Sequence, residues 1–290
     1  MSSTESPYLE LLREIQEKGE VRADRTGVGT KSLFGKRMEF SLDGQLPVIT
    51  TKKVLVDKVV HELLWMVSGS TAVRDLQTRG VRFWDANSTR EFLDARGLTS
   101  YEEGDLGPVY GFQWRHWGAE YTGMDADYTG AGIDQLQCVV DTIRNDPGSR
   151  RNLLSAWNVA DVAKMALPPC HLMAQFYVSE GTHLDCQLYQ RSADMFLGVP
   201  FNITSYSLLT CMLAKLCGLR PGRLIHVLGD AHVYLTHEEA VKTQLSREPY
   251  SFPTLRFKKE RYGSVDEFSF GDFIVENYRH YPFIRAQMAV

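Results

Sequence analysis

One stretch of the chain gathers side chains that could carry out chemistry. Between positions 167 and 203 lie a thiol, a guanidinium, a hydroxyl, a carboxylate and an amide, at Cys170, Arg191, Ser192, Asp194 and Asn202. A thiolate can attack an electrophilic carbon, and a guanidinium can bind an anion. These residues permit a nucleophile beside an anion-binding group, provided that the fold brings them together.

The elements around these residues predict how they meet. Leu172–Val178 is apolar enough for a buried strand, and Leu184–Gln190 has the composition of a second strand. Glu180, Gly181 and Thr182 between them favour a turn. A hairpin of these strands would carry Cys170 at one end and return Arg191 and Ser192 to the same end.

Each of these residues also has a structural interpretation. A lone cysteine is more often a small buried hydrophobe than a nucleophile. An Arg-Ser pair after a strand is usually part of a loop or a helix cap, and Asn202 could simply cap the following helix. Taken one at a time, these interpretations are the better bets.

Other parts of the chain offer further candidates. Apolar residues at helical spacing predict a helix over 56–67, and Glu62 lies on it among apolar neighbours. If Glu62 faces a cavity, its pKa would rise and it could shuttle protons. The glycine-rich turn at 24–30 contains Arg25, and a twin arginine stands at Arg150 and Arg151. Both are either plain solvated turns or anion clamps.

Length and composition set the broad class. The chain has 290 residues, 43% of them hydrophobic, and a net charge of −4, which does not indicate a nucleic-acid surface. We expect no signal peptide and no membrane span. Five cysteines without metal-like spacing fit reduced thiols in the cytoplasm or the nucleus. Helices and strands alternate irregularly, which predicts one α+β domain, 1–290, around a large sheet.

Two motifs resemble a known family. The string PPCH at 168–171 and QRSADMFLGVPFNI at 190–203 are similar to thymidylate synthases of the eukaryotic or viral branch. The likeness extends from about Tyr8 to Val290 and includes DRTGVGT, HELLWMVSGST, GDLGPVYGFQWRHWGAEY, SRR, GDAHVY and the final MAV. It implies a large mixed sheet flanked by helices, and a homodimer in which the sheets pack back to back.

The resemblance also implies a reaction. The family converts dUMP to dTMP with 5,10-methylenetetrahydrofolate, which supplies a one-carbon unit and a hydride and leaves as dihydrofolate. Cys170 would attack C6 of the uracil. The other catalytic residues implied are Glu62, Tyr110, Asn202, Arg191 and His171. No metal, membrane or nucleic acid is expected.

The implied binding residues fall into two sets. The substrate would contact Arg25, Gln190, Arg191, Ser192, Asp194, Asn202, His232 and Tyr234, with Arg150 and Arg151 reaching its phosphate from the partner subunit. The folate would contact Trp84, Asp194, Leu197, Gly198, Phe201 and the tail at Val290. Family members that act on cytosine nucleotides typically have an aspartate at this position, so Asn202 favours dUMP over dCMP as the substrate.

Three alternatives remain open. A hydroxymethylase on the same fold would let water reach the nucleotide, whereas Trp84 and Leu167 match residues that shield it. A non-catalytic paralogue would only bind a nucleotide or a partner. A metal site at His226, His232 and His237 fits no usual ligand spacing. The chain also departs from the family pattern at five positions, none of them catalytic and several of them near the folate cleft or the dimer contacts, namely Ala72, Asn152, Val159, Thr236 and Tyr281.

Overall fold

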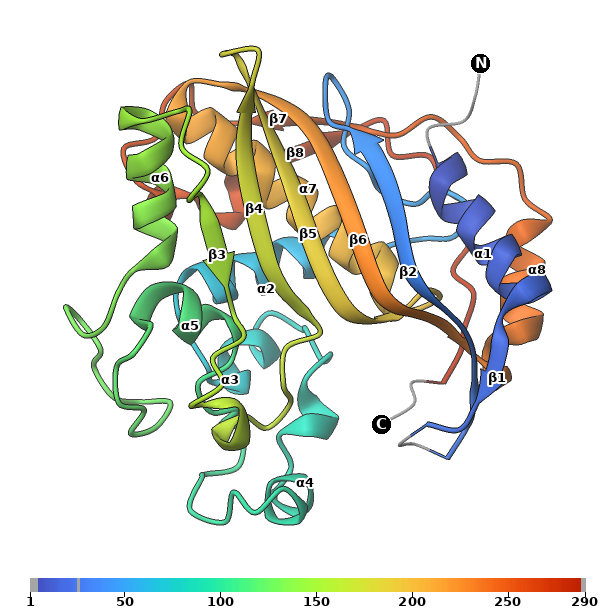
Figure 1. Ribbon diagram of the computed structural model, residues 1–290, viewed down its shortest axis with the longest axis horizontal. Helices are drawn as coiled ribbons and strands as arrows, with labels where there is room; N and C mark the ends of the chain where they lie inside the picture. Colours follow the sequence, from blue (N-terminus) through green and yellow to red (C-terminus); the bar gives the residue numbers. More distant parts are fainter. Residues whose placement is uncertain (1–4, 25–26, 288–290) are drawn as a thin grey trace.

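A mixed sheet of six strands forms the centre of the computed structural model, which describes residues 5–24 and 27–287 (Figure 1). The order across the sheet is β1-β2-β6-β5-β4-β3. Only β5 and β6 run parallel, and the other neighbours are antiparallel. The strands are β1 (Glu20–Arg22), β2 (Thr30–Ser41), β3 (Leu153–Ser155), β4 (His171–Ser179), β5 (His183–Asp194) and β6 (Arg220–Tyr234).

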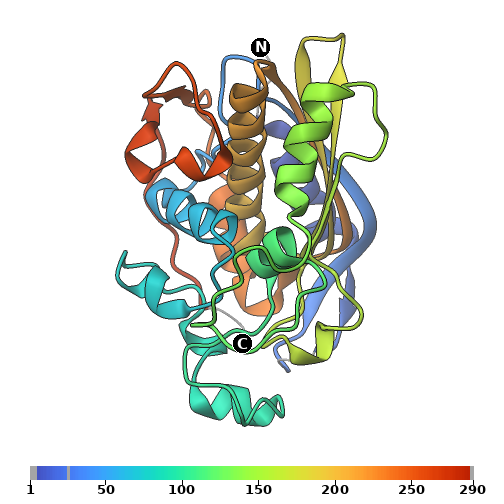
Figure 2. The same ribbon diagram turned by 90° about the vertical axis from the view of Figure 1, so that its left-hand side faces the viewer.

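Helices cover one face of this sheet (Figure 2). The longest, α7 (Gly198–Cys217), is buried along most of its length and packs on β5 and β6. The others are α1 (Ser6–Lys18), α2 (Val56–Val67), α3 (Val73–Gln77), α4 (Arg90–Ala95), α5 (Tyr110–His116), α6 (Gln135–Asn145) and α8 (Glu238–Leu245). A small hairpin joins β7 (Thr254–Phe257) to β8 (Phe273–Glu276), and short 3₁₀ turns lie at η1 (Asp85–Asn87), η2 (Val162–Lys164), η3 (Leu235–His237), η4 (Val265–Glu267) and η5 (Phe270–Asp272).

The predicted α+β class with a large mixed sheet flanked by helices is confirmed. The predicted hairpin is formed by β4 and β5, and Glu180 and Gly181 adopt positive φ angles of 52° and 68° at its turn. The predicted helix over 56–67 is α2, and Gly69 after it has a φ of 78°. In the parts of the chain that the structure describes, we find no helix with the length and apolarity of a membrane span.

The second face of the sheet carries no helix within residues 5–24 and 27–287 (Figures 1 and 2). Strand residues alternate between the two faces. Ala174 and Phe176 of β4 face the helices and are buried, whereas Tyr177 remains 61% exposed. Phe34 of β2 is 78% exposed. Both aromatic side chains therefore lie on the surface of this single chain.

Candidate active site

Many of the candidate residues lie at one end of the strands, the lower end in Figure 1. Here β4 begins next to Cys170, while β5 and β6 end. The register pairs His171 with Gln190, and Asp194 with His232. Parallel pairing of β5 and β6 therefore brings side chains from distant motifs to the same place.

Cys170 and Arg191 lie side by side, as the hairpin predicted. The Arg191 backbone N–H donates to the Cys170 carbonyl at 2.9 Å. Its guanidinium donates to the carbonyls of Pro169 at 2.8 Å and Pro168 at 3.0 Å, and Nη2 lies 3.9 Å from Cys170 Sγ. A cation this close favours the thiolate over the thiol. The structural interpretation of Cys170 as a buried hydrophobe does not fit these contacts.

Tyr110 and His171 support the nucleophile from the helix side. The Cys170 N–H donates to the Tyr110 hydroxyl at 2.9 Å, and the Tyr110 ring stacks on His171 at 4.3 Å. Nδ1 of His171 lies 3.0 Å from the hydroxyl of Tyr206 on α7. Burial lowers the pKa of His171 to about 3, so this imidazole is neutral. Sequence reasoning missed Tyr206, because it reads as one more core position of α7.

Glu62 faces the same cluster. Its carboxylate accepts a hydrogen bond of 2.8 Å from Nε1 of Trp84, and the Trp84 ring lies 5.8 Å from Tyr110. Withdrawal from water raises the pKa of Glu62 to about 7, and the bond from Trp84 offsets this only in part. A carboxyl with this pKa can both give and take a proton near neutral pH.

The second motif spans the end of β5, the turn after it and the start of α7. Asp194 Oδ1 accepts from the N–H groups of Phe196 at 3.0 Å and Leu197 at 3.1 Å, which fixes the turn into the helix. Asn202 lies inside α7, so it does not cap this helix. Its Oδ1 lies close to Gly198, where an added Cβ would stand 3.8 Å away. The Phe201 ring meets Phe83 edge-on at 5.0 Å, which provides an apolar wall for a flat ring.

The end of β6 contributes His232 and Tyr234. Burial alone would lower the pKa of His232, but the hydrogen bond with Asp230 at 3.1 Å and the nearby carboxylates outweigh it and raise this pKa. The ring of His232 meets that of Tyr234 edge-on at 5.3 Å. This pair presents polar atoms next to Asp194 across the strand pairing.

Gln190 is buried on β5, directly before Arg191. Its Oε1 lies 2.8 Å from Nε2 of His226, and its own amide donates to the Ser192 carbonyl at 3.0 Å. An amide oxygen can only accept, so Nε2 of His226 carries the proton and donates to Gln190. Burial lowers the pKa of His226 to about 3 and keeps this ring neutral. These bonds hold the strand that carries Arg191 and Ser192.

The structure does not bring Arg150 and Arg151 to Cys170. Both are exposed, and the Arg150 carbonyl accepts from Nε2 of Gln175 at 3.3 Å. Gln175 stands five residues along β4 from Cys170, or about 16 Å at the rise of a strand. The predicted residues Arg25 and Val290 lie outside the described residues.

Each of the three histidines raised as metal ligands bonds to a different protein group: Gln190 for His226, Asp230 for His232 and Gln287 for His237. Over residues 5–24 and 27–287 the structure forms no cluster of three or more ligating side chains suited to a metal ion.

Two of the positions that depart from the family pattern differ in how far the fold buries them. Asn152 is fully buried, and its Oδ1 has no hydrogen-bond partner among the described residues. Val159 is 81% exposed.

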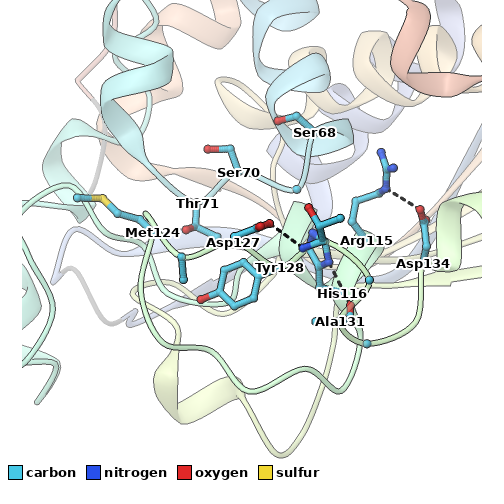
Figure 3. Close-up of a pocket in the computed structure, with 15 residues that line it drawn as sticks. Ser68, Ser70, Thr71, Arg115, His116, Met124, Asp127, Tyr128, Ala131 and Asp134 are labelled. Carbon is cyan, nitrogen blue, oxygen red and sulfur yellow. Dashed lines mark hydrogen bonds and ion pairs between the residues drawn. The ribbon is translucent and has the colours of Figure 1, made fainter.

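A separate cavity of about 590 Å³ lies between the end of α2, the end of α5 and the loop before α6 (Figure 3). Several polar side chains that line it are bonded to other groups of the protein. Arg115 pairs with Asp134 at 3.0 Å and with Asp266 at 2.7 Å, and the Tyr128 hydroxyl bonds to Gly123. None of the residues proposed from the two sequence motifs lines this cavity, which is therefore separate from the cluster around Cys170.

The fold and the geometry around Cys170 first define the class of protein. This is an α+β protein in which a cysteine thiol lies 3.9 Å from an arginine guanidinium, and in which a buried carboxyl beside aromatic rings has a pKa near 7. The family model of thymidylate synthase matches residues 6–290. The chain belongs to the thymidylate synthase family.

Relatives cover nearly the whole chain. It is 55% identical to the thymidylate synthase of Herpesvirus ateles, over 99% of this chain and 98% of that protein. It is 53% identical to the thymidylate synthase of Homo sapiens, over 99% of this chain and 91% of that protein. The bifunctional dihydrofolate reductase-thymidylate synthase of Leishmania major is 55% identical, and the chain spans 55% of its length.

Proposed function

We propose that this protein catalyses the reductive methylation of dUMP to dTMP. The observation that carries the proposal is the Cys170 thiol held beside Arg191 at the edge where the family motifs converge. The co-substrate 5,10-methylenetetrahydrofolate supplies the one-carbon unit and the hydride, and leaves as dihydrofolate.

The Cys170 thiolate explains how uracil C5, a poor nucleophile, becomes reactive. Uracil C5 does not attack an electrophile unaided. Addition of the Cys170 thiolate to C6 moves electron density toward O4 and C5, so that C5 can form the new carbon–carbon bond. The Asn202 amide donates to O4 and accepts from N3–H, which stabilises this enolate and selects uracil over cytosine.

Proton movements fall to two groups on the helix side. Glu62, with its pKa near 7, exchanges protons close to O4 and the folate. Tyr110 lies next to Cys170 and assists removal of the C5 proton. His171 is neutral, and it keeps the Tyr110 ring in place by stacking.

The remaining predicted residues bind the two substrates. Arg191, Ser192 and Arg25 hold the nucleotide phosphate, and His232 and Tyr234 hold the sugar hydroxyl. Gln190 positions this strand from below. The apolar walls fit a flat pterin, with Asp194 for its polar edge, and the folate residues are Trp84, Asp194, Leu197, Gly198, Phe201 and Val290.

Exclusion of water selects the methyl product. Trp84 is 7% exposed and Leu167 is half-buried, so both can shield the new carbon. Water at this carbon would give a hydroxymethyl group instead.

We propose that the active protein is a homodimer in which two uncovered sheet faces pack together. By alternation along β5, Arg191 shares the face of Tyr189 and Gln187, which is the face without helices. Arg150 and Arg151 are exposed near Gln175, on the same face of β4. A two-fold axis through this face would carry the twin arginines of one protomer toward Arg191 of its partner.

We propose that residues 1–290 act as one catalytic domain. The five cysteines are free in the described parts of the chain, and Cys170 must be reduced to react, so the cytoplasm or the nucleus suits this protein. Fractionation of cells and detection with a specific antibody would check this location.

The reaction is tested by incubating the protein with dUMP and methylenetetrahydrofolate. The expected result is an absorbance rise from dihydrofolate, with dTMP identified by mass. Tetrahydrofolate with hydroxymethyl-dUMP would mean that water enters, and the shielding by Trp84 and Leu167 would be wrong. The matched control is Cys170→Ala, which should lose turnover but still bind dUMP. Full turnover by this variant would exclude the thiol mechanism.

The shared site is tested with mixed chains. Cys170→Ala and Arg151→Ala homodimers should each be nearly inactive. Heterodimers of the two contain one site with both native residues, provided that Arg151 crosses the interface. Recovered activity in the mixture supports that crossing, and inactive heterodimers of verified composition would exclude it.

A further inference from the structure

A buried histidine inside the sheet bonds to the residue that precedes the active-site arginine. His226 lies on β6, between β2 and β5 (Figure 1), and its side chain is fully buried. The register pairs it with Met38 of β2 and with Leu188 of β5. Alternation along β5 places Gln190 on the same face as Leu188, which is the face that the helices cover. His226 and Gln190 are therefore neighbours in the core, and Gln190 is only 2% exposed.

The groups around Gln190 fix the direction of both of its hydrogen bonds. The Ser192 carbonyl can only accept, so the Gln190 atom 3.0 Å from it is the amide nitrogen. The amide oxygen then points to His226 and accepts from Nε2 at 2.8 Å. In the neutral ring Nδ1 carries no proton, and it has no partner among the described residues. One chain of donors thus runs from His226 through Gln190 to Ser192.

The donor on His226 selects one orientation of the Gln190 amide. The two ends of an amide have nearly the same size, so packing alone does not distinguish them. With the amide reversed, its oxygen would face the Ser192 carbonyl, and its nitrogen would face the N–H of His226. The other tautomer of His226 would accept from a reversed amide, but its Nδ1–H would then be buried without an acceptor in the described structure. Both reversed arrangements leave like groups opposed or buried groups unpaired, which costs free energy.

This chain of donors acts on the nucleotide side of the site and not on the thiol. Arg191 is held by the carbonyls of residues 168–170, through its backbone N–H and its guanidinium. None of these bonds involves Gln190. The Ser192 carbonyl, in contrast, receives the Gln190 amide directly. A change at His226 is therefore transmitted to Ser192, while the guanidinium keeps its place beside the thiol.

We propose that His226 is a positioning residue for dUMP binding, which fixes the orientation of the Gln190 amide and, through it, the end of β5 at Ser192. The inference rests on the proposed function, in which Gln190, Arg191 and Ser192 contact the nucleotide. An amide nitrogen carries two hydrogens, and the described residues give a partner to one of them. The orientation that His226 selects therefore leaves one N–H of Gln190 for the substrate, whereas a reversed amide would offer an acceptor instead.

The test separates binding from turnover. His226→Phe keeps a buried ring between Met38 and Leu188 but removes the donor. We expect the Kd for dUMP, measured by titration calorimetry, and the KM for dUMP to rise about tenfold, the effect of one lost buried hydrogen bond. At saturating substrates kcat should stay within about threefold, because the contacts of Arg191 persist. A smaller fraction of folded protein would lower kcat and leave KM unchanged, so this split is specific to positioning.

Two further variants control for the shape of the core. His226→Gln places an amide donor at a reach similar to that of Nε2, and it should recover most of the affinity for dUMP. Met38→Leu, at the position paired with His226, alters the neighbouring packing but leaves the hydrogen bond in place. Its Kd and KM for dUMP should stay within about twofold of wild type.

A second background shows whether His226 acts through Gln190. Gln190→Met keeps the length of the side chain but has no amide. In this background His226→Phe should change the Kd for dUMP by less than about twofold. An equal tenfold loss in both backgrounds, or an unchanged Kd in His226→Phe alone, would overturn the proposal. Should His226→Phe fail to fold, His226→Leu takes its place in both backgrounds. If the wild-type protein neither binds nor turns over dUMP, the proposed function itself is wrong, and the role of His226 falls with it.

Discussion

Replacing Glu62 by glutamine should change how stability depends on pH by a calculable amount. In the folded protein, burial raises the pKa of Glu62 from 4.5 to about 7. Between these values the unfolded chain ionises while the folded chain keeps its proton, so the free energy of unfolding falls as pH rises. A difference of about 2.5 pKa units at about 1.4 kcal/mol each gives a loss of about 3 kcal/mol, complete just above pH 7.

Glu62→Gln has nearly the same shape and keeps an oxygen for Trp84 Nε1, but it cannot ionise. The variant should therefore gain stability relative to wild type as pH rises from about 4.5 to about 7, by up to about 3 kcal/mol. The assay is urea denaturation of both proteins at four pH values across this range. The other titrating groups, such as His232, are present in both proteins and cancel in the difference.

Two parallel stability curves would refute the reasoning, because they would mean that Glu62 titrates at its ordinary pKa in the fold. A difference of opposite sign would mean that the folded state prefers the ionised carboxylate. In either case the role of Glu62 as a proton donor and acceptor near neutral pH would lose its physical basis.

Three further substitutions test other parts of the site. Asn202→Asp replaces the amide donor toward O4 by a carboxyl. The ratio of kcat/KM for dUMP to kcat/KM for dCMP should therefore fall at least tenfold, a loss of about 1.4 kcal/mol of discrimination. An unchanged ratio would remove the argument that Asn202 selects uracil. Tyr206→Phe removes the hydroxyl 3.0 Å from His171 and should lower kcat about tenfold with little effect on dUMP binding; equal kcat would show that His171 needs no such support. Gly229→Ala would place a Cβ 2.7 Å from the Arg191 carbonyl oxygen, so β5 and β6 must move apart and the KM for dUMP should rise. A crystal structure of the variant in which Arg191 has not moved would contradict this.

Local patterns predicted the elements whose neighbours are close in sequence. The apolar periodicity of α2 and the turn between β4 and β5 are visible without a structure, and so the meeting of Cys170 with Arg191 was predictable. Helix α5 was not predicted, because its seven residues are mostly aromatic or charged and follow no stripe. Strand β6 extends through the polar residues of GDAHVY to Tyr234, because pairing with β2 and β5 holds these residues in extended form.

Contacts between distant elements were beyond sequence reasoning from periodicity. Tyr206 and His237 both look like ordinary core or surface positions in a one-dimensional pattern. Their contacts depend on which atoms the fold places beside them, namely His171 Nδ1 for Tyr206 and the Gln287 carbonyl for His237. The pKa of Glu62 likewise depends on burial by the surrounding fold, so it could be predicted only on the condition that Glu62 faces a cavity.

The two motifs that carry the family resemblance are one physical unit. Proline has no N–H, so Pro168 and Pro169 present only carbonyls, and their fixed φ angles aim these at one place. Arg191 fills that place with hydrogen bonds of 2.8 and 3.0 Å, and its backbone N–H reaches the Cys170 carbonyl. The guanidinium is therefore held near Sγ before any substrate arrives, and little reorganisation is needed when the thiolate forms. The number of residues between the two motifs is set by the length of the β4–β5 hairpin, because both strands must be long enough for His171 to pair with Gln190.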